Sequence, residues 1–202
     1  MKYPNSFIIF DIETTGFSGT KDKCTEIGAI KIVEGKVIST FNTLLNWNIE
    51  IPEKITQLTG ITKELLDKEG IDPDMAFAKF MQFISGGEIL MGHNILKFDI
   101  PFLEGNFGEF VRLGDEILDI AALYKAKKLG ISKYEAETYG AFAKRVLSQV
   151  HYGVKYSIDT ACVEFKIDKS KITQHRALGD CHLTHEIFKN LINDKVNSSI
   201  TA

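Results

Sequence analysis

Cysteine and proline are both scarce in this chain of 202 residues, which contains three cysteines and four prolines. Cys24, Cys162 and Cys181 stand far apart and form no C-x-x-C pair, so neither a disulfide framework nor a cysteine zinc site is expected. We interpret them as reduced packing residues. The chain also lacks repeats, low-complexity blocks and linkers. Its length fits one domain, which we place at residues 1–196, with a frayed tail at 197–202.

Long apolar runs are absent as well. None approaches the roughly 18 residues that cross a bilayer, so no membrane partner is expected. The first residues, MKYPNSFIIFDIETTG, lack the zones of a signal peptide, and we expect a cytoplasmic protein. A net charge of −3 argues against a broad basic surface that coats long nucleic acid. It leaves open an enzyme that grips a strand end and uses bound cations for local positive charge.

The hydrophobic pattern predicts an α/β sheet. Apolar β-rich runs with a turn at Glu34-Gly35 predict three consecutive antiparallel strands, and two shorter runs predict a fourth and a fifth strand. These strands are expected at residues 6–12, 25–33, 36–45, 88–91 and 116–120. Apolar residues at helical spacing predict helices at residues 74–84, 99–110, 155–165 and 176–193, and one that follows the fifth strand to residue 128. Strands that alternate with helices favour this fold class.

Residues 130–153 are polar, with helical character around residues 135–147, and they connect two better-defined segments. We interpret them as an insertion into the domain. Four roles stay open for this insertion: a lid, a surface for a partner, a wall specific to a substrate, or a plain extra helix.

Two further clusters of residues, one of lysines and one of histidines, are given ordinary structural explanations. Lys125, Lys127 and Lys128 are interpreted as a solvated face. His182 and His185 lie about one helical turn apart, which is compatible with zinc, but an exposed helix face is the simpler explanation.

Two carboxylates stand at the end of the first predicted strand. Because side chains alternate along a strand, Asp11 and Glu13 point to the same face. Two anions side by side repel each other unless a cation lies between them. From this pair alone, a metal site and a coincidence are equally favoured. Thr14, Thr15 and Gly16 follow as a tight exit, where a nucleotide can approach closely.

Two later segments add acids. In MGHNILKFD, Asp99 stands at the expected start of a helix, where capping that helix is the simpler explanation. In QHRALGD, His175 precedes the last helix and Asp180 lies in its first turn. On a regular helix their side chains would be about 140° apart, so a shared role requires His175 to lie on the loop before the helix.

Taken together, four acids from three segments, without cysteine, describe a centre for a hard cation such as Mg²⁺ or Mn²⁺. Two such ions about 4 Å apart can bridge a phosphodiester, one lowering the pKa of the attacking water and the other neutralising the leaving oxygen. Histidine side chains ordinarily titrate near neutral pH, so His175 can take the proton of that water.

The three motifs FDIETTG, GHN-x4-D and HRALGD resemble those of the DEDDh branch of the DnaQ-like 3′→5′ exonucleases. The segment ITQLTGIT at residues 55–62 looks like the one that packs near the terminal nucleotide in polymerase III-type members, so the epsilon and PolC-type proofreading domains are the most similar group. The resemblance covers nearly all of the chain except residues 130–153. It implies a ribonuclease H-like layered fold, with a mixed five-stranded sheet whose first three strands are antiparallel, flanked by helices.

The resemblance also implies roles for single residues. The ligands of two divalent cations, Mg²⁺ or Mn²⁺, would be Asp11, Glu13, Asp99 and Asp180, and the general base would be His175. Contacts to the substrate would come from Thr14, Thr15, Gly16, Leu58, His93 and Asn94.

The activity implied is the release of nucleoside 5′-monophosphates from the 3′ end of DNA, single-stranded or frayed, in proofreading or repair, and a DNA polymerase is one partner that it suggests. Two alternatives stay open. One is a 3′→5′ exoribonuclease that trims RNA or short oligonucleotides. The other is an inactive module that binds nucleic-acid ends or a polymerase, although such a module has no need of four buried anions.

Overall fold

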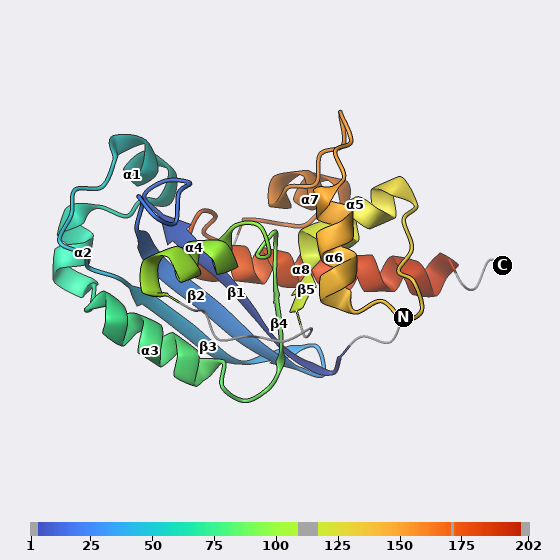
Figure 1. The fold of residues 1–202 in the computed structure, drawn as a ribbon, viewed down its shortest axis with the longest axis horizontal. Coiled ribbons are helices and arrows are strands. Elements are labelled where there is room, and N and C mark those ends of the chain that lie inside the picture. The colour runs from blue at the N-terminus through green and yellow to red at the C-terminus, as the bar shows by residue number, and fades with distance from the viewer. Residues whose placement is uncertain (1–3, 109–116, 171, 199–202) are drawn as a thin grey trace.

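The computed structural model describes residues 4–108, 117–170 and 172–198, with side chains up to residue 193. The strands of these ranges form one twisted sheet with helices around it (Figure 1). The strands are β1 (Ser6–Thr14), β2 (Cys24–Val33), β3 (Lys36–Leu44), β4 (Ile89–Gly92) and β5 (Ile117–Asp119). The helices are α1 (Glu53–Thr59), α2 (Lys63–Glu69), α3 (Pro73–Phe83), α4 (Asp99–Phe107), α5 (Ile120–Leu129), α6 (Tyr139–Ser148), α7 (Ile158–Glu164) and α8 (Ala177–Ser198).

The sheet has the strand order β3-β2-β1-β4-β5. β1 pairs antiparallel with β2, and β2 pairs antiparallel with β3. On its other edge β1 pairs parallel with β4, which pairs parallel with β5. The predicted α/β class and the mixed five-stranded sheet with three antiparallel strands at its start are therefore confirmed, and β1 lies at the centre of the sheet.

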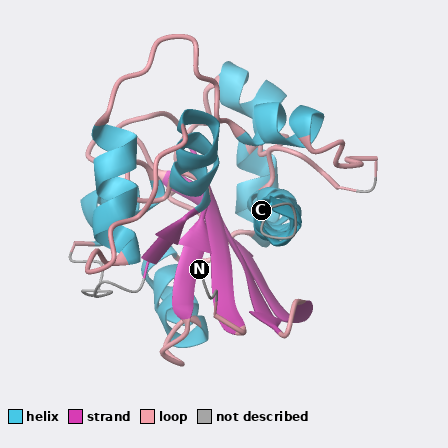
Figure 2. Cartoon of the chain, turned by 90° about the vertical axis from the view of Figure 1, so that its right-hand side faces the viewer, coloured by secondary structure: helices cyan, strands magenta, loops and turns pink. Residues whose placement is uncertain are grey.

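Both faces of β1 are buried, and alternate residues of this strand belong to two separate cores. Phe7 and Ile9 pack in a core with residues of α5, α6, α7 and α8. Ile8, Phe10 and Ile12 pack on the opposite face with residues of α3 and α4. Figure 2, which looks along α8, shows this helix on one side of the sheet and other helices on the opposite side. The end of β1 is thus enclosed by helices from both layers.

The predicted helices differ from the structure by a few residues at their ends, and α4 ends at Phe107, before the predicted residue 110. α3 begins at Pro73 because the carboxylate of Asp72 accepts a hydrogen bond from the Met75 amide at 3.0 Å and caps the helix. α7 begins only at Ile158, since Ser157 caps it, and it is shorter than the predicted 155–165. α8 continues to Ser198, past residue 197 where we placed the tail. The predicted helix at 99–110, the predicted strand at 116–120 and the predicted tail at 197–202 each include residues outside the described ranges. These residues are 109–110, 116 and 199–202.

The segment at residues 130–153 is packed into the main core. α6 buries Phe142, Val146 and Leu147 in the same core as α5 and β5. Lys125 is buried at 2% exposure and its ammonium donates to the Gln149 carbonyl, so its interpretation as part of a solvated face is wrong. The side chain of Lys125 lies under the end of α6 because that helix covers α5. That residues 130–153 are an insertion into the domain stays a prediction.

α8 is the longest helix of the described residues, with 22 residues. It lies across β1 and β2. The helical spacing that predicted this helix is confirmed, since one face of it buries Ala177, Cys181, Thr184, Phe188 and Leu191. His185 is buried too, with its ring edge-on to Phe7 at 6.1 Å. The interpretation of His185 as an exposed helix face is therefore wrong, because the sheet covers that side of α8. In the described ranges, neither α8 nor another helix has the length and apolarity needed to cross a membrane.

Candidate active site

Asp11 and Glu13 continue the row of β1 side chains that faces α8. Phe7 and Ile9 of the same row pack in the core beneath that helix, so the strand alternation directs the two carboxylates towards α8. Asp180 comes from the first turn of α8. One carboxylate oxygen from each of the three residues lies within 4.8 Å of the other two. The structure therefore brings Asp11, Glu13 and Asp180 into one acidic cluster.

Two glycines let the start of α8 lie close to its neighbours. Gly28 of β2 is opposite Asp11 in the strand register, and a Cβ atom on Gly28 would lie 2.5 Å from the Leu178 amide nitrogen. A Cβ atom on Gly179 would lie 1.9 Å from the Thr173 carbonyl oxygen. Since real Cβ atoms do not approach so closely, both positions need glycine. This close packing brings Asp180 to the end of β1.

Glu26 fixes the segment that precedes α8. Its carboxylate is fully buried and accepts two hydrogen bonds from the guanidinium of Arg176 and one, at 3.0 Å, from the Ala177 amide. It also accepts one from Asn42 at 3.0 Å. Glu26 stands opposite Glu13 in the sheet. Sequence reasoning missed this residue, although an acid inside the apolar run of a predicted buried strand was a usable signal.

Asp99 reaches the end of β1 from α4. It is the first residue of that helix, is buried at 3% exposure, and accepts a hydrogen bond from the Ile12 amide at 3.1 Å. The helix has Phe98 as its N-cap and no side-chain cap. The simpler explanation of Asp99 as a helix cap is therefore wrong. Asp99 lies outside the group of three mutually close carboxylates, but it acts on Asp11 through its charge.

The four acids have raised pKa values, and burial is the largest cause for each. Burial and the charge of Asp99 raise the pKa of Asp11 well above its usual range. Burial and the charge of Asp180 raise the pKa of Glu13 to about 8. Burial raises the pKa of Asp99 to about 7 and that of Asp180 to about 6. Anions that repel each other in a buried site made only of oxygen ligands fit a hard divalent cation.

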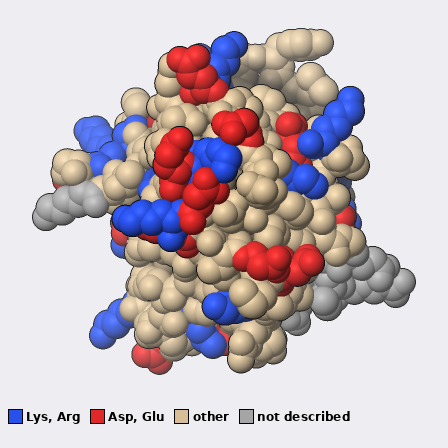
Figure 3. Space-filling view, turned by 90° about the vertical axis from the view of Figure 1, so that its left-hand side faces the viewer, with Lys and Arg blue, Asp and Glu red and all other residues tan. Residues whose placement is uncertain are grey.

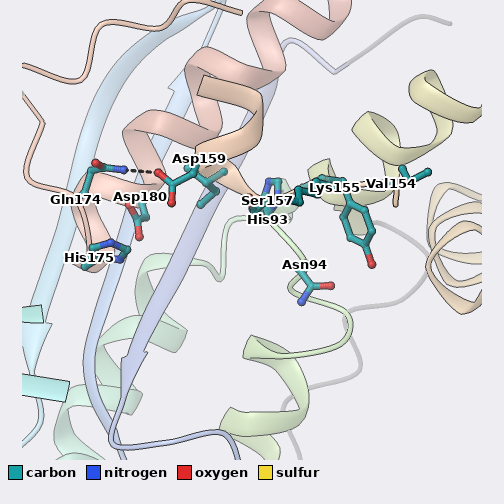
Figure 4. A pocket seen from close by; sticks show the side chains of 11 residues that line it. His93, Asn94, Val154, Lys155, Ser157, Asp159, Gln174, His175 and Asp180 are labelled. Atoms are coloured by element: carbon teal, nitrogen blue, oxygen red, sulfur yellow. Dashed lines mark hydrogen bonds between the residues drawn. The ribbon is translucent and has the colours of Figure 1, made fainter. Parts of the chain in front are cut away.

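His175 lies directly before α8, on the loop where a shared role with Asp180 required it. Its backbone has a φ of +54°, a left-handed conformation that ends the loop and is uncommon for a residue with a side chain. The His175 backbone donates a hydrogen bond to the Asp180 carboxylate. Both residues line the same cavity, and Figure 4 shows their side chains at the same end of it.

That cavity has a volume of about 580 Å³ and runs from the acidic cluster to the loop between α6 and α7. At the end with His175 and Asp180, the amide of Gln174 donates to the Asp159 carboxylate at 3.0 Å (Figure 4). The other lining residues are His93, Asn94, Val154, Lys155, Tyr156, Ser157 and Ile158.

The loop of the second motif is wrapped around a buried aspartate. Asp119 is fully buried and accepts hydrogen bonds from the amides of Asn94 and Leu96, both at 3.1 Å, and from the Ala122 amide at 3.2 Å. Burial raises the pKa of Asp119 to about 6. Asn94 has a φ of +69°, which asparagine tolerates better than most residues. Asp119 therefore positions Asn94 at the cavity, and sequence reasoning missed it.

His93 joins this motif to the far wall of the cavity. Its Nε2 lies 2.8 Å from the Tyr156 carbonyl oxygen, and because a carbonyl only accepts, Nε2 carries the proton. Burial lowers the pKa of His93 to about 4. The ring is thus neutral at pH 7 and holds the loop between α6 and α7.

The exit from β1 is a tight turn with few free polar groups. The Thr15 amide donates to the Lys23 carbonyl and the Thr15 hydroxyl accepts from the Lys23 amide, both at 2.9 Å. The Thr14 hydroxyl donates to the Gly16 carbonyl at 2.6 Å. The Thr15 amide is thus engaged by Lys23, whereas the Thr15 hydroxyl only accepts there and keeps its own proton for a further partner. Leu58 lies on α1 with 52% of its surface exposed, so its side chain is available for contact.

Charges of both signs are mixed on the face of the molecule that Figure 3 shows, and neither sign dominates it. That face includes α1 and α2, where Lys63 pairs with Asp67 at 2.6 Å. It therefore offers no broad basic surface for long nucleic acid.

Comparisons with known proteins agree with the motifs. The model of the RNase_T exonuclease family matches residues 8–188. The chain is 30% identical to the PolC-type DNA polymerase III of Clostridium perfringens over 188 residues, which are 93% of this chain and 11% of that protein. It is 32% identical over 187 residues to the same enzyme of Caldanaerobacter subterraneus, with 92% of this chain and 11% of that protein covered. The chain thus spans about a tenth of the length of these relatives.

Solved structures share the fold at lower identity. Exonuclease I of E. coli in complex with a dA16 oligonucleotide aligns with a TM-score of 0.67 and 17% identity, over 91% of this chain and 40% of that one. Exonuclease X in complex with 5′ overhanging duplex DNA aligns with a TM-score of 0.61 and 20% identity, over 93% and 92% of the two chains. The protein belongs to the RNase_T exonuclease family. It is a nuclease of ribonuclease H-like fold, and the predicted resemblance is confirmed.

Proposed function

We propose that this enzyme is a 3′→5′ exonuclease that hydrolyses the last phosphodiester bond of a DNA strand, single-stranded or frayed, and releases a nucleoside 5′-monophosphate in proofreading or repair. The observation that carries the proposal is the meeting of the Asp11, Glu13 and Asp180 carboxylates within 4.8 Å, with the buried carboxylate of Asp99 beside them. A cluster of this kind is costly without a cation, so it supports a metal-dependent hydrolase.

The proposed metal ligands are Asp11, Glu13, Asp99 and Asp180. Their oxygen atoms suit Mg²⁺ or Mn²⁺ better than softer metals. Two such ions bound there would lower the pKa of a water molecule and neutralise the leaving 3′ oxygen. The chain's own contribution is to hold the carboxylates in place, through the Ile12 amide for Asp99 and the His175 backbone for Asp180.

His175 is the proposed general base. It lies at the end of the cavity with Asp180, within a segment that Glu26 fixes through Arg176 and the Ala177 amide. A histidine in this position can remove the proton of an attacking water at neutral pH. The backbone bond from His175 to the Asp180 carboxylate keeps the proposed base next to the acidic cluster.

The proposed contacts to the substrate lie on both sides of the acidic cluster. Thr14, Thr15, Gly16 and Leu58 would hold the terminal nucleotide, with Thr15 limited by its bonds to Lys23. His93 and Asn94 would face the nucleotide that enters the cavity. Because the Thr15 amide is engaged by Lys23, a hydrogen bond donated by Thr15 to the nucleotide would come from its hydroxyl.

DNA is the favoured polymer, because the similar polymerases are DNA polymerases and the structures of exonuclease I and exonuclease X named above hold DNA. The same relatives support a DNA polymerase as partner. Trimming of RNA is the second candidate, since sensing a 2′-hydroxyl depends on one or two local contacts. An inactive module that binds strand ends has less support, because the cluster of Asp11, Glu13 and Asp180 repels a phosphate backbone when no cation is bound. Action in the cytoplasm stays a prediction.

The test is a digestion in Mg²⁺ or Mn²⁺ of 5′-labelled DNA and RNA strands of equal sequence, single and paired. The proposal expects a ladder that shortens from the 3′ end, with DNA digested faster than RNA, and no digestion by the isosteric variant Asp11→Asn. A faster ladder with RNA would favour the exoribonuclease. Intact strands in both metals would contradict both enzymes.

A further inference from the structure

We propose that the loop at residues 149–157, between α6 and α7, forms a wall of the substrate site, and that Tyr152 and Lys155 bind the strand on the 5′ side of the scissile bond. The inference rests on the proposed function, because it takes a nucleic-acid strand as the ligand. It assigns a role to the end of the segment at residues 130–153, for which the sequence left a lid, a partner surface, a wall and a plain helix open.

The loop lines the same cavity as the reacting groups. Val154, Lys155 and Tyr156 contribute to the wall of the 580 Å³ cavity that also contains His175 and Asp180. Figure 4 shows Val154 and Lys155 at one end of the cavity and His175 and Asp180 at the other. A molecule that fills the cavity therefore meets both the reacting groups and the loop.

Four side chains hold this loop and the end of α6 in place through backbone carbonyls. The donors are Lys97 to Leu147 at 2.6 Å, His93 to Tyr156 at 2.8 Å, Lys128 to Lys155 at 3.0 Å, and Lys125 to Gln149. His93 and Lys97 belong to the motif that also supplies Asp99. The wall is thus fixed to the candidate active site by the residues that build that site, as a substrate contact requires.

The tip of the loop exposes apolar surface. Tyr152 is 97% exposed and Val150 is 77% exposed. Within the described part of the chain, the Tyr152 ring has neither a hydrogen bond nor a ring contact. Proteins that bind single strands without sequence preference stack bases on such aromatic rings. Tyr152, two residues before Val154 of the cavity wall, therefore offers a platform for a base.

Lys155 supplies the matching charge. Among the described residues that line the cavity, it is the one lysine or arginine. Its side chain is exposed, and its ammonium makes no ion pair or hydrogen bond with the described part of the chain. The other lysines near the loop are used on backbone carbonyls. A free cation beside a cavity whose other end is acidic fits a backbone phosphate.

The arrangement of the elements gives the direction of the strand. α1, which carries Leu58, lies on one side of the end of β1, and α6 and α7 lie on the other (Figure 1). A strand whose last nucleotide contacts Leu58 and whose scissile phosphate lies at the acidic cluster must leave through the cavity towards Tyr152. A protein bound to the loop would instead cover the cavity that the reaction needs.

The test compares Tyr152→Ala and Lys155→Ala with wild type, using unlabelled DNA of 2 and 12 nucleotides and chromatography of the released mononucleotide. On the 12-mer we expect KM to rise about fivefold or more for Tyr152→Ala, as for loss of one stacked base, while kcat stays unchanged. On the dinucleotide both variants should match wild type. Equal KM values on the 12-mer for both variants and wild type would overturn the proposal.

Binding gives a readout that does not depend on cleavage. Anisotropy of a 5′-labelled 12-mer in Ca²⁺ should show weaker binding for both variants. The slope of log K against log salt should fall by about 0.7 for Lys155→Ala, the value for one phosphate contact on a single strand, and stay unchanged for Tyr152→Ala. Lys144→Ala and Tyr134→Ala, which remove exposed residues of the same segment, are the matched controls and should match wild type.

The outcomes separate this proposal from the function on which it rests. If wild type cuts DNA but the loop variants bind and cut the 12-mer equally well, the wall is wrong and the exonuclease stands. If wild type binds the 12-mer without cutting it, and Tyr152→Ala weakens that binding, the wall stands and the exonuclease falls. If wild type neither binds nor cuts, both are wrong.

Discussion

The guanidinium of Arg176 donates two hydrogen bonds to the buried carboxylate of Glu26, from Nη2 at 2.7 Å and from Nε at 2.9 Å. This pair joins β2 to the loop that carries His175, across 150 residues of sequence. It thereby sets the position of the proposed general base relative to the carboxylates of β1.

Loss of this pair should affect both stability and turnover. Arg176→Met leaves the Glu26 carboxylate buried with fewer donors, and we expect a loss of about 3 kcal/mol in the free energy of unfolding, as for other broken buried pairs. Urea unfolding measures it, with kcat measured on the same preparation. Lys63→Met, which removes a surface pair with Asp67, is the control and should change little. Equal effects of both variants would contradict a special role for Glu26.

Asp119 should matter for the loop of the second motif. Asp119→Asn replaces one acceptor oxygen with a donor that faces the amide of Leu96 or Asn94. An unsatisfied buried donor costs about 1–3 kcal/mol, and Asn94 should lose its fixed position. The free energy of unfolding, measured in urea, and kcat/KM on a 12-mer should both decrease. Stability that decreases without any change in kcat/KM would show that the loop does not act on the substrate.

The acidic cluster predicts an unusual dependence of stability on pH. Glu13 and Asp99 have pKa values of about 8 and about 7 in the folded protein, against about 4 in the unfolded chain. At pH values between about 4 and about 8, the folded protein therefore binds more protons than the unfolded chain. The stabilisation is complete below pH about 4 and is lost as the pH rises through 7 to 8.

We accordingly expect the metal-free protein to melt at a lower temperature at pH 8 than at pH 6. Mg²⁺ should raise the melting temperature more at pH 8, since it binds the deprotonated carboxylates. In Asp11→Asn, both the pH effect and the Mg²⁺ effect should be smaller. Differential scanning calorimetry in EDTA and in Mg²⁺ measures all three. A melting temperature that rises from pH 6 to pH 8 in EDTA would contradict the raised pKa values of the acidic cluster.

His175 should be needed for turnover and not for metal binding. His175→Ala should lower kcat by about 10²–10⁴-fold, the usual range for a lost general base, while the shift in melting temperature with Mg²⁺ stays as in wild type. His182→Ala, a change on the half-buried side of α8, serves as the control. If His175→Ala turns over at the wild-type rate, another group removes the proton.

Much of the fold could be predicted from the sequence, because its strands and long helices carry clear periodic patterns. The apolar β-rich run at the start of the chain predicted β1, and apolar residues at helical spacing between Ala177 and Leu191 predicted α8. α1 and α2 were not predicted, because a helix of seven residues carries little of the helical period. α7 has the same length and was predicted only with bounds that are too wide. The buried side of His185 was missed because the pattern of one helix does not say how broad the sheet beneath it is.

The residues of the candidate site also fall into those that the sequence could predict and those that it could not. Residues in compact motifs, such as Asp11 and Asp180, could be found because local geometry and the resemblance pointed to them. Glu26 and Asp119 act through contacts with segments 150 and 25 residues away, and no local pattern contains such distances. The same holds for the wall, since Lys155 meets the cavity only after α6 has packed on α5.

The most direct measurement is the identity of the product released from a 12-nucleotide DNA strand in Mg²⁺, followed by chromatography and mass spectrometry over time. The account predicts nucleoside 5′-monophosphates that appear in order from the 3′ end with wild type, and none with Asp11→Asn. Products that carry a 3′-phosphate, release in order from the 5′ end, or equal release by Asp11→Asn would contradict it.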